Sequence, residues 1–456
     1  MADLTVKFAG ITSPNPFWLA SGPPSNTGDQ VARAFDAGWG GAVWKTIGEA
    51  IVNTSSRYGA IDLEGVKMMG FNNIELISDR PTETNFREIS EVKKRYPQNL
   101  VIASLMVESK RESWHEMVHR AEGAGSDALE LNFGCPHGMS ERGMGSAVGQ
   151  VPEYTEMITS WVKEVARVPV IVKLTPNVTS VSHIAAAAER GGADAVSLIN
   201  TINSLMSVDL DNFSPAPNVG GKSTHGGYCG PAVKPIALHL LSTVAKNVRI
   251  PISGIGGIGH WNDAAEHIAL GASTVQVCTA AMHYGFRIVE DMIDGLSEYM
   301  DAHGFRSIED FRGRAVPNVT DWGELDLNYK VIAEIDPKLC IGCQLCYIAC
   351  EDGAHQAIAP WRPEPSASHA NGKQATHVAN IGEGNGAAKT NGEGFSVHVP
   401  RILEEECVGC NLCALVCPVD GCITMRQIHT DRAPMSWNDR TRNQSKECAP
   451  PTSTTD

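Results

Sequence analysis

Short apolar segments alternate with longer amphipathic stretches along the first two thirds of the chain. Several of these segments, such as Val168–Leu174, are apolar on both faces, as a parallel sheet covered by helices requires. Eight segments alternating with helical stretches predict an α/β fold, a TIM (β/α)8 barrel, and a doubly wound open sheet is the alternative. The predicted strands are Phe17–Ser21, Gly41–Thr46, Leu100–Leu105, Asp127–Phe133, Val168–Leu174, Ala195–Thr201, Pro251–Gly254 and Thr274–Thr279.

Polar residues gather where the predicted strands end. In a TIM barrel the carboxyl ends of the strands form the mouth that carries the chemistry, so these residues locate the candidate site before any motif is considered. They are Lys45, Ser104, Asn132, Lys173, Asn200 and Thr201.

The pattern predicts two domains and a polar tail. The barrel occupies residues 1–330, and a small cysteine-rich domain follows at residues 331–425. Inside the second domain, residues 354–395 have almost no large apolar side chains, a composition that predicts a flexible insert. The polar residues 426–456 are expected to form a disordered tail.

Charge and composition narrow the possible partners. The formal net charge is −15 without a basic stripe, which makes nucleic acid a poor candidate. Residues Met1–Gly10 lack the features of a targeting peptide, and no apolar run approaches the ~18 residues that span a bilayer. We therefore expect a cytoplasmic protein with no membrane partner. In that reducing compartment the 13 cysteines are better explained as ligands than as disulfides.

Eight cysteines near the C-terminus form two runs with the same C-x2-C-x2-C-x3-C spacing, which is typical of two-cluster ferredoxins. In that arrangement three thiolates of one run and the fourth of the other hold each [4Fe-4S] cluster. A pair of zinc sites is the alternative, but a zinc site usually takes its ligands from two separate C-x2-C pairs and does not need a third cysteine at the same two-residue spacing. The predicted ligands are Cys340, Cys343, Cys346 and Cys417 for one cluster and Cys407, Cys410, Cys413 and Cys350 for the other.

A glycine-rich turn, Gly254–Gly259, follows the seventh predicted strand and has the form G-x-G-x-x-G. A dinucleotide site would need an acidic residue about 20 residues further on, where this chain has Val277–Ala280. In a barrel, a turn at this place presents backbone N–H groups to a phosphate. We expect a flavin phosphate here, with a dinucleotide site or a plain tight turn as alternatives.

The fourth predicted strand ends in a glycine-rich loop with a cysteine at its root. A thiol with a pKa of about 8.5 is mostly protonated at neutral pH, so Cys135 is a candidate proton donor, and a small core residue is the alternative. His137 is a candidate to assist it or a structural hydrogen-bonding residue. Lys45 and Lys173 end strands where a buried ammonium would stabilise a reduced flavin, unless they extend to the rim.

Together these motifs resemble the dihydropyrimidine dehydrogenase family, most closely the FMN and iron–sulfur subunit of the bacterial NAD-dependent enzymes. The resemblance spans about residues 1–425 without the insert, and its motifs are Ala128–Met139 (ALELNFGCPHGM), Gly70–Ile77 (GFNNIELI) and Gly254–Gly257 (GIGG). It implies a dihydroorotate dehydrogenase-like barrel that binds FMN. It also implies the reduction of uracil or thymine to the 5,6-dihydro form.

The resemblance further implies roles for individual residues. Cys135 would protonate C5 of the pyrimidine after hydride has reached C6, with His137 as a second catalytic candidate. Polar side chains would bind the edges of the ring, and residues at the strand ends would bind the flavin. The implied substrate contacts are Asn72, Asn132, Asn200 and Thr201, and the implied cofactor contacts are Ser21, Lys45, Thr46, Lys173, Gly254, Gly256, Gly257, Cys278 and Thr279.

The resemblance implies a partner as well. The chain offers no NAD site, so electrons from NADH would enter through a separate FAD-containing flavoprotein subunit, in a heterotetramer. One alternative function is a dihydroorotate dehydrogenase, whose orotate carboxylate would need a cationic or amide clamp. Another is an electron-transfer iron–sulfur flavoprotein without pyrimidine chemistry, in which the barrel is a scaffold.

Overall fold

The computed structural model describes residues 2–63, 65–360, 388–390 and 396–447. Contacts divide the chain into two compact units, Met1–Val319 and Thr320–Asp456. The predicted flexible insert, residues 354–395, lies mostly outside the described residues. None of the described helices combines the length and apolarity that a bilayer span requires.

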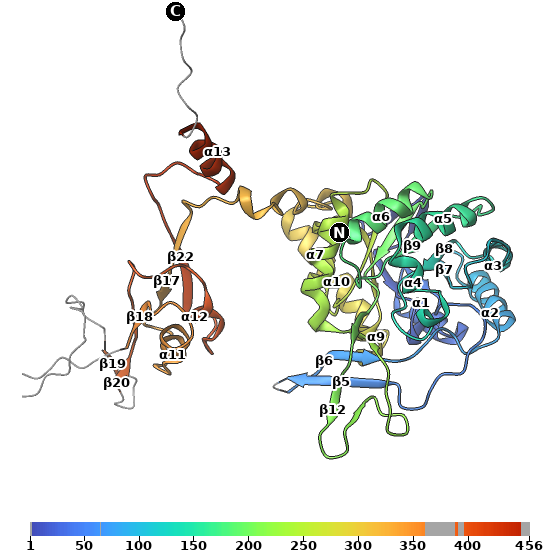
Figure 1. Cartoon of the computed structure of the whole chain (residues 1–456), viewed down its shortest axis with the longest axis horizontal. Coiled ribbons are helices and arrows are strands. Elements are labelled where there is room, and N and C mark those ends of the chain that lie inside the picture. Colours follow the sequence, from blue (N-terminus) through green and yellow to red (C-terminus); the bar gives the residue numbers. More distant parts are fainter. Residues whose placement is uncertain (1, 64, 361–387, 391–395, 448–456) are drawn as a thin grey trace, which may run out of the picture. The chain divides into compact units, whose positions relative to one another are not determined.

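Eight parallel strands of the first unit close into a barrel (Figure 1). Their order around the barrel follows the chain, and each strand overlaps its predicted segment, so the TIM-barrel prediction is confirmed. The strands are β3 Phe17–Leu19, β4 Gly41–Val43, β7 Leu100–Leu105, β8 Ala128–Asn132, β9 Val170–Lys173, β10 Ala195–Leu198, β15 Ile252–Ile255 and β16 Ala272–Val277.

Helices cover the outside of the barrel because the strands bury apolar side chains on both faces. The ends of helix α1 show how the sequence determines where a helix begins and stops. At its start, Thr27 Oγ1 accepts a hydrogen bond from the Gln30 N–H at 3.2 Å. At its end, Gly38 adopts a φ of 110°, which favours glycine. The covering helices are α1 Gly28–Ala37, α2 Thr82–Arg95, α3 Arg111–Gly123, α5 Pro152–Lys163, α6 Val181–Arg190, α7 Lys234–Ala245, α8 Trp261–Ala269 and α10 Ile288–His303.

A short hairpin closes the amino end of the barrel. It consists of β1 Val6–Phe8 and β2 Ile11–Ser13. The Phe8 ring packs edge-on against Trp18 of β3, with 5.2 Å between the ring centroids. Both rings belong to the buried apolar cluster inside the barrel, so this end is filled and the opposite end is left for the site.

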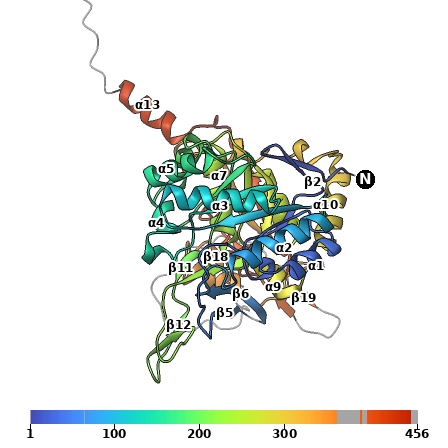
Figure 2. The ribbon, with the colours of Figure 1, turned by 90° about the vertical axis from the view of Figure 1, so that its right-hand side faces the viewer.

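A four-stranded antiparallel sheet, which the sequence pattern did not predict, extends from the loops that follow β4 and β10 (Figures 1 and 2). Since those loops leave the carboxyl ends of the barrel strands, the sheet lies at the mouth. Its strands, in sheet order, are β11 Ile202–Ser204, β14 Gly226–Cys229, β6 Val66–Asn73 and β5 Tyr58–Leu63. A further hairpin, β12 Ser207–Asp209 and β13 Ser214–Ala216, joins β11 to β14, and the short helices α4 Ser146–Gly149 and α9 Thr279–Tyr284 follow β8 and β16.

The second unit contains two similar halves, one for each cysteine run. A strand pair, β17 Lys330–Ile335 with β22 Ile423–Ile428, frames it, and helices α11 Leu345–Glu351 and α12 Leu412–Leu415 contact each other. Its core consists largely of the cysteines and small apolar residues around them. Smaller strand pairs are β18 Ile358–Ala359 with β21 Arg401–Ile402 and β19 Ala388–Thr390 with β20 Ser396–His398.

Part of the predicted disordered tail is a helix, which corrects that prediction. Helix α13 spans Trp437–Glu447, and Ser436 caps it by accepting from the Asp439 N–H at 3.1 Å. The Trp437 ring lies 6.0 Å from that of Trp322, and Asp326 Oδ1 accepts from the Met435 N–H at 3.0 Å. The second unit begins at Thr320, about ten residues before the predicted domain boundary at residue 330. Residues 448–456 lie outside the described residues.

Candidate active site and cluster-binding sites

A cavity of about 510 Å³ opens at the mouth of the barrel. Its walls are the ends of the barrel strands and the inner side of the antiparallel sheet. Its volume lies within the range of about 300–1,000 Å³ that is usual for ligand pockets. The predicted site residues in its wall are Ser21, Lys45, Thr46, Asn132, Cys135, His137, Lys173, Asn200, Thr201, Gly256, Gly257, Cys278 and Thr279.

Asn72, predicted to contact substrate, does not line the cavity. Its Nδ2 donates to Ser204 Oγ at 2.7 Å, and the side chain packs against Gly226. The next residue, Asn73, lines the cavity instead. Successive side chains of a strand point to opposite faces, so of the two adjacent asparagines on β6 Asn73 faces the cavity. Asn72 Oδ1 is buried without a hydrogen-bonding partner among the described residues, and its substrate contact stays a prediction.

Gly254, predicted to contact the flavin phosphate, also lies away from the cavity. It is inside β15, where an added Cβ would come within 2.9 Å of His267 Cδ2 on helix α8. The glycine is therefore needed for close packing of strand and helix. The turn reaches the cavity only from Ile255 onwards, with Gly256 and Gly257 at φ values of 128° and 73° that favour glycine.

The polar side chains at the mouth form a continuous hydrogen-bonded chain. Asn132 Nδ2 donates to Thr46 Oγ1 at 2.8 Å, and Asn132 Oδ1 accepts from Asn200 Nδ2 at 3.0 Å. Asn200 Oδ1 in turn accepts from the Thr201 N–H at 2.8 Å. Thr46 Oγ1 is itself held 3.1 Å from Ser21 Oγ. Each amide is thus fixed in orientation, with a remaining N–H available to a ligand.

Lys173, at the end of β9, is paired inside the barrel. Its Nζ lies 3.6 Å from Oε1 of Glu130, a carboxylate that is completely buried. Glu130 Oε2 accepts from Ser197 Oγ at 2.8 Å and from Gln276 Nε2 at 3.2 Å. These contacts offset the free-energy cost of burying the charged groups. They hold the Lys173 ammonium in the cavity wall and away from the rim.

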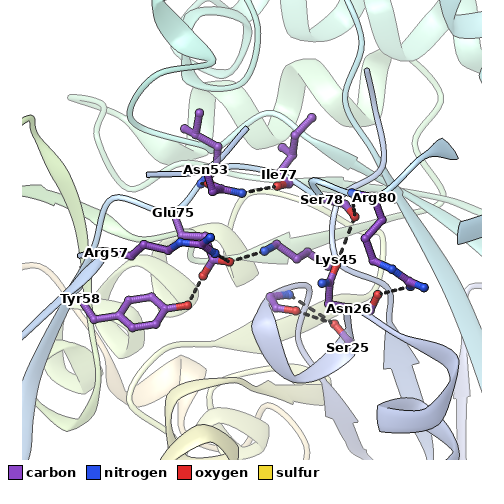
Figure 3. Close-up of polar contacts among 12 residues, drawn as sticks. Ser25, Asn26, Lys45, Asn53, Arg57, Tyr58, Glu75, Ile77, Ser78 and Arg80 are labelled. Atoms are coloured by element: carbon purple, nitrogen blue, oxygen red, sulfur yellow. Dashed lines mark hydrogen bonds and ion pairs between the residues drawn. The ribbon is translucent and has the colours of Figure 1, made fainter. Parts of the chain in front are cut away.

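Lys45, at the end of β4, belongs to a second charged cluster, which is centred on Glu75 (Figure 3). Glu75 Oε1 lies 2.5 Å from Lys45 Nζ and 3.1 Å from Arg57 Nη1, and Oε2 accepts from the Tyr58 hydroxyl. Burial raises the pKa of Tyr58, and the hydrogen bond to Glu75 raises it further. The Glu75 side chain is only 7% exposed, so Lys45 is also a buried, paired cation in the cavity wall.

Cys135 is buried in the wall of the cavity, on the loop after β8. The preceding Gly134 lies so close to Asn200 that an added Cβ would come within 2.5 Å of its Cβ, which explains the glycine there. Burial raises the pKa of the Cys135 thiol to about 11, although the positive charge of Lys173 opposes the rise. The thiol is therefore protonated at neutral pH.

His137, on the same loop, is a neutral hydrogen-bonding group. Burial lowers its pKa, and its Nε2 lies 3.0 Å from the main-chain oxygen of Glu75. A carbonyl oxygen only accepts, so Nε2 carries the proton and Nδ1 is an acceptor. Nδ1 is buried and has no hydrogen-bonding partner among the described residues. A ligand N–H could satisfy it.

The donor set of the cavity fits FMN. Two buried ammonium groups, Lys45 and Lys173, suit the electron-rich edge of a flavin ring, and the amides suit its polar atoms. At one end of the cavity, Gly256 and Gly257 expose backbone in a turn that closely approaches Lys234. Cys278 and Thr279, at the start of α9, face the same end, as the phosphate site of this barrel type requires.

The two cysteine runs form two hollows in the second unit, with the predicted partition. Cys340, Cys343, Cys346 and Cys417 line one, and Cys350, Cys407, Cys410 and Cys413 line the other. Among the described residues, no group of His, Cys, Asp or Glu side chains is arranged to hold a single metal ion. Four thiols spread around a hollow suit a larger iron–sulfur cube better than one zinc ion.

Several cavity residues were not predicted from the sequence. Glu75 and Tyr58 were missed because neither ends a barrel strand, although Glu75 follows Asn73 at the two-residue spacing of a shared strand face. Lys234 was missed too: its Nζ lies 2.7 Å from Asp263 Oδ1 and 3.0 Å from Glu266 Oε2. No signal in the sequence places that lysine beside the glycine turn.

Two family models match the chain. The dihydroorotate dehydrogenase model matches residues 3–300, and the 4Fe-4S dicluster domain model matches residues 339–422. These matches cover the barrel and the two cysteine runs respectively, and agree with the fold class predicted from the sequence.

Curated relatives extend the similarity across both units. The chain is 43% identical over 371 residues to the NAD-dependent dihydropyrimidine dehydrogenase subunit PreA of Escherichia coli, covering 80% of this chain and 90% of the relative. It is 41% identical over 346 residues to the chloroplastic dihydropyrimidine dehydrogenase (NADP(+)) of Arabidopsis thaliana, covering 73% and 81%. It is 37% identical over 322 residues to the catalytic subunit of dihydroorotate dehydrogenase B (NAD(+)) of Pyrococcus horikoshii, covering 69% and 98%. The chain therefore belongs to the dihydroorotate dehydrogenase family and, within it, to the dihydropyrimidine dehydrogenases that carry a 4Fe-4S dicluster domain.

Proposed function

We propose that the chain is the catalytic subunit of an NAD-dependent dihydropyrimidine dehydrogenase and reduces uracil or thymine to the 5,6-dihydro form. The observation that carries the proposal is a protonated thiol, Cys135, in the wall of a cavity that also contains two paired lysines and oriented amides. Reduction of a ring C=C bond needs a hydride and a proton. FMN held in this cavity would supply the hydride for C6 of the ring.

The residues of the chain supply the proton and the orientation. Cys135 donates its thiol proton to C5, since burial keeps the thiol protonated until it is needed. Asn73, Asn132, Asn200 and Thr201 bind the carbonyl and N–H edges of the pyrimidine, and the unpartnered Nδ1 of His137 accepts a further N–H. A ring without those groups would leave buried polar atoms unpaired and is rejected for that reason.

The cofactor contacts follow from the same geometry. Lys45, Lys173, Ser21 and Thr46 would hold the flavin ring, and Gly256, Gly257, Cys278 and Thr279 would hold its phosphate. The eight cysteines of the two runs would hold two [4Fe-4S] clusters, whose chemistry is one-electron transfer. A relative is named as a subunit, which supports a partner; we propose an FAD-containing flavoprotein that oxidises NADH, in a cytoplasmic heterotetramer.

The competing dihydroorotate dehydrogenase activity has less support in this cavity. An orotate carboxylate needs a cationic or amide clamp. No arginine lines the described cavity wall, and the lysines there, Lys45, Lys173 and Lys234, are each paired with carboxylates, so the clamp would fall to the amides that the proposal assigns to the ring edges. The related Pyrococcus subunit is matched over 69% of this chain, against 80% for the Escherichia coli dihydropyrimidine dehydrogenase subunit.

The direct test is steady-state NADH oxidation by the chain mixed with its flavoprotein partner. Uracil, thymine and orotate are supplied in parallel as electron acceptors, and the pyrimidine product is identified by mass spectrometry. We expect NADH oxidation that depends on uracil or thymine. Activity confined to orotate would replace the proposal by the dihydroorotate reaction, and no pyrimidine-dependent activity would leave only electron transfer.

A further inference from the structure

A fifth cysteine lies in one of the two cluster hollows. Cys422 is 2% exposed and lines the hollow formed by Cys340, Cys343, Cys346 and Cys417. Its Sγ lies 3.9 Å from the main-chain oxygen of Asp336, and its side chain shares the hollow with those of Cys417 and Cys340. It falls outside both C-x2-C-x2-C-x3-C runs, so ferredoxin spacing assigns it no role.

The other half of the unit has an alanine at the matching backbone position. The Asp336 N–H donates to the Cys422 carbonyl oxygen at 2.8 Å, and in the other half the Leu403 N–H donates to the Ala357 carbonyl oxygen, also at 2.8 Å. Asp336 and Leu403 are themselves equivalent, since each accepts at 3.0 Å from the N–H of the first cysteine of its run.

Comparing Cys422 with Ala357 shows whether the position needs a sulfur atom or only a small apolar group. Ala357 is 3% exposed and lines the hollow of Cys350, Cys407, Cys410 and Cys413, as Cys422 lines its own. A methyl group therefore suffices to fill the position in one half. The sulfur of Cys422 adds a soft iron ligand to the other half, in the same hollow as the four predicted ligands.

We infer that Cys422 is a reserve ligand for the cluster that Cys340, Cys343, Cys346 and Cys417 hold. The inference rests on the cluster assignment proposed above. When Cys417 is absent, Cys422 releases its thiol proton to solvent and forms the iron–sulfur bond that Cys417 no longer makes. The four-thiolate set stays complete. Among the described residues, no fifth cysteine lines the hollow beside Ala357, so we expect no such reserve there.

The test is the iron and acid-labile sulfide content of the full chain, purified without oxygen. Two [4Fe-4S] clusters correspond to about eight iron atoms per chain, which we expect for the wild type and for Cys422→Ala. Cys417→Ala should also keep about eight, and the double variant Cys417→Ala/Cys422→Ala should fall to about four.

The second half provides the matched control. Cys350→Ala should fall directly to about four iron atoms, and adding Ala357→Cys to it should restore about eight. Iron near four in Cys417→Ala, while Cys422→Ala keeps about eight, would overturn the inference and leave the cluster assignment intact. So would about eight in the Cys417→Ala/Cys422→Ala double variant. A wild-type chain without iron would instead overturn the cluster assignment and the inference with it.

Discussion

The Nζ of Lys45 lies 2.5 Å from Oε1 of Glu75, and the main-chain oxygen of Glu75 lies 3.0 Å from Nε2 of His137. One residue therefore connects the lysine at the end of β4 with the loop that carries Cys135. Figure 3 shows the contacts of Glu75 with Lys45, Arg57 and Tyr58. Through Arg57 and Tyr58, Glu75 also binds β5 and the segment before it to the barrel. We regard Glu75 as a positioning residue, because its partners, and not Glu75 itself, are assigned to cofactor and substrate.

Replacing this carboxylate should destabilise the protein. Glu75→Gln leaves Lys45 and Arg57 without their negative partner, and breaking a buried ion pair from one side costs about 3–5 kcal/mol. We expect urea unfolding, followed by tryptophan fluorescence, to shift to lower denaturant. The matched control is Asp62→Asn, which breaks an exposed pair with Lys67 and should leave the curve unchanged. Equal shifts in the two variants would show that the ion pairs of Glu75 stabilise the protein no more than an exposed ion pair does.

The proton donor is tested by Cys135→Ser. A hydroxyl is a much weaker acid than a thiol, so we expect turnover to fall by about 10²-fold or more, the range of general acid catalysis. Bound flavin should stay at the wild-type level, since the Cys135 side chain is assigned to substrate and not to FMN. The measurements are steady-state rates and flavin content per chain. Near-normal turnover would remove Cys135 from the mechanism.

The pH dependence follows from the buried thiol. A general acid acts in its protonated form, so activity is retained below the pKa and lost above it. The pKa of Cys135 is raised to about 11, so the rate of flavin reoxidation by uracil should stay flat from neutral pH to about pH 9, above which the ring N–H of uracil itself ionises. A fall centred on about pH 8.5, the value of an ordinary thiol, would contradict the assigned environment.

The two neighbouring asparagines of β6 should behave differently. Asn73 lines the cavity, so Asn73→Ala should raise the KM for uracil about tenfold, which corresponds to about 1.4 kcal/mol. Asn72 binds Ser204 on the other face, so Asn72→Ala should lower thermal stability and leave the KM unchanged. The reverse pattern would restore the sequence-based choice of Asn72.

The barrel could be predicted from the sequence because its strands are apolar on both faces and recur between amphipathic helices. The antiparallel sheet could not, since β5 is exposed along most of its length and carries no two-residue alternation of burial. The same gap explains why Asn72 was chosen over Asn73, because a period-two argument needs a strand whose faces are known. The spacing of the eight cysteines predicted the two groups that line the two hollows, but it gave no reason to notice Cys422.

The most direct test of the central claim is an anaerobic half-reaction. The isolated chain is reduced chemically, mixed with uracil or thymine, and followed by flavin absorbance while the pyrimidine is analysed by mass spectrometry. The account predicts that the flavin band returns as dihydrouracil or dihydrothymine forms, and that Cys135→Ser suppresses the return. A flavin that stays reduced with both pyrimidines, or a chain that binds no FMN, would contradict it.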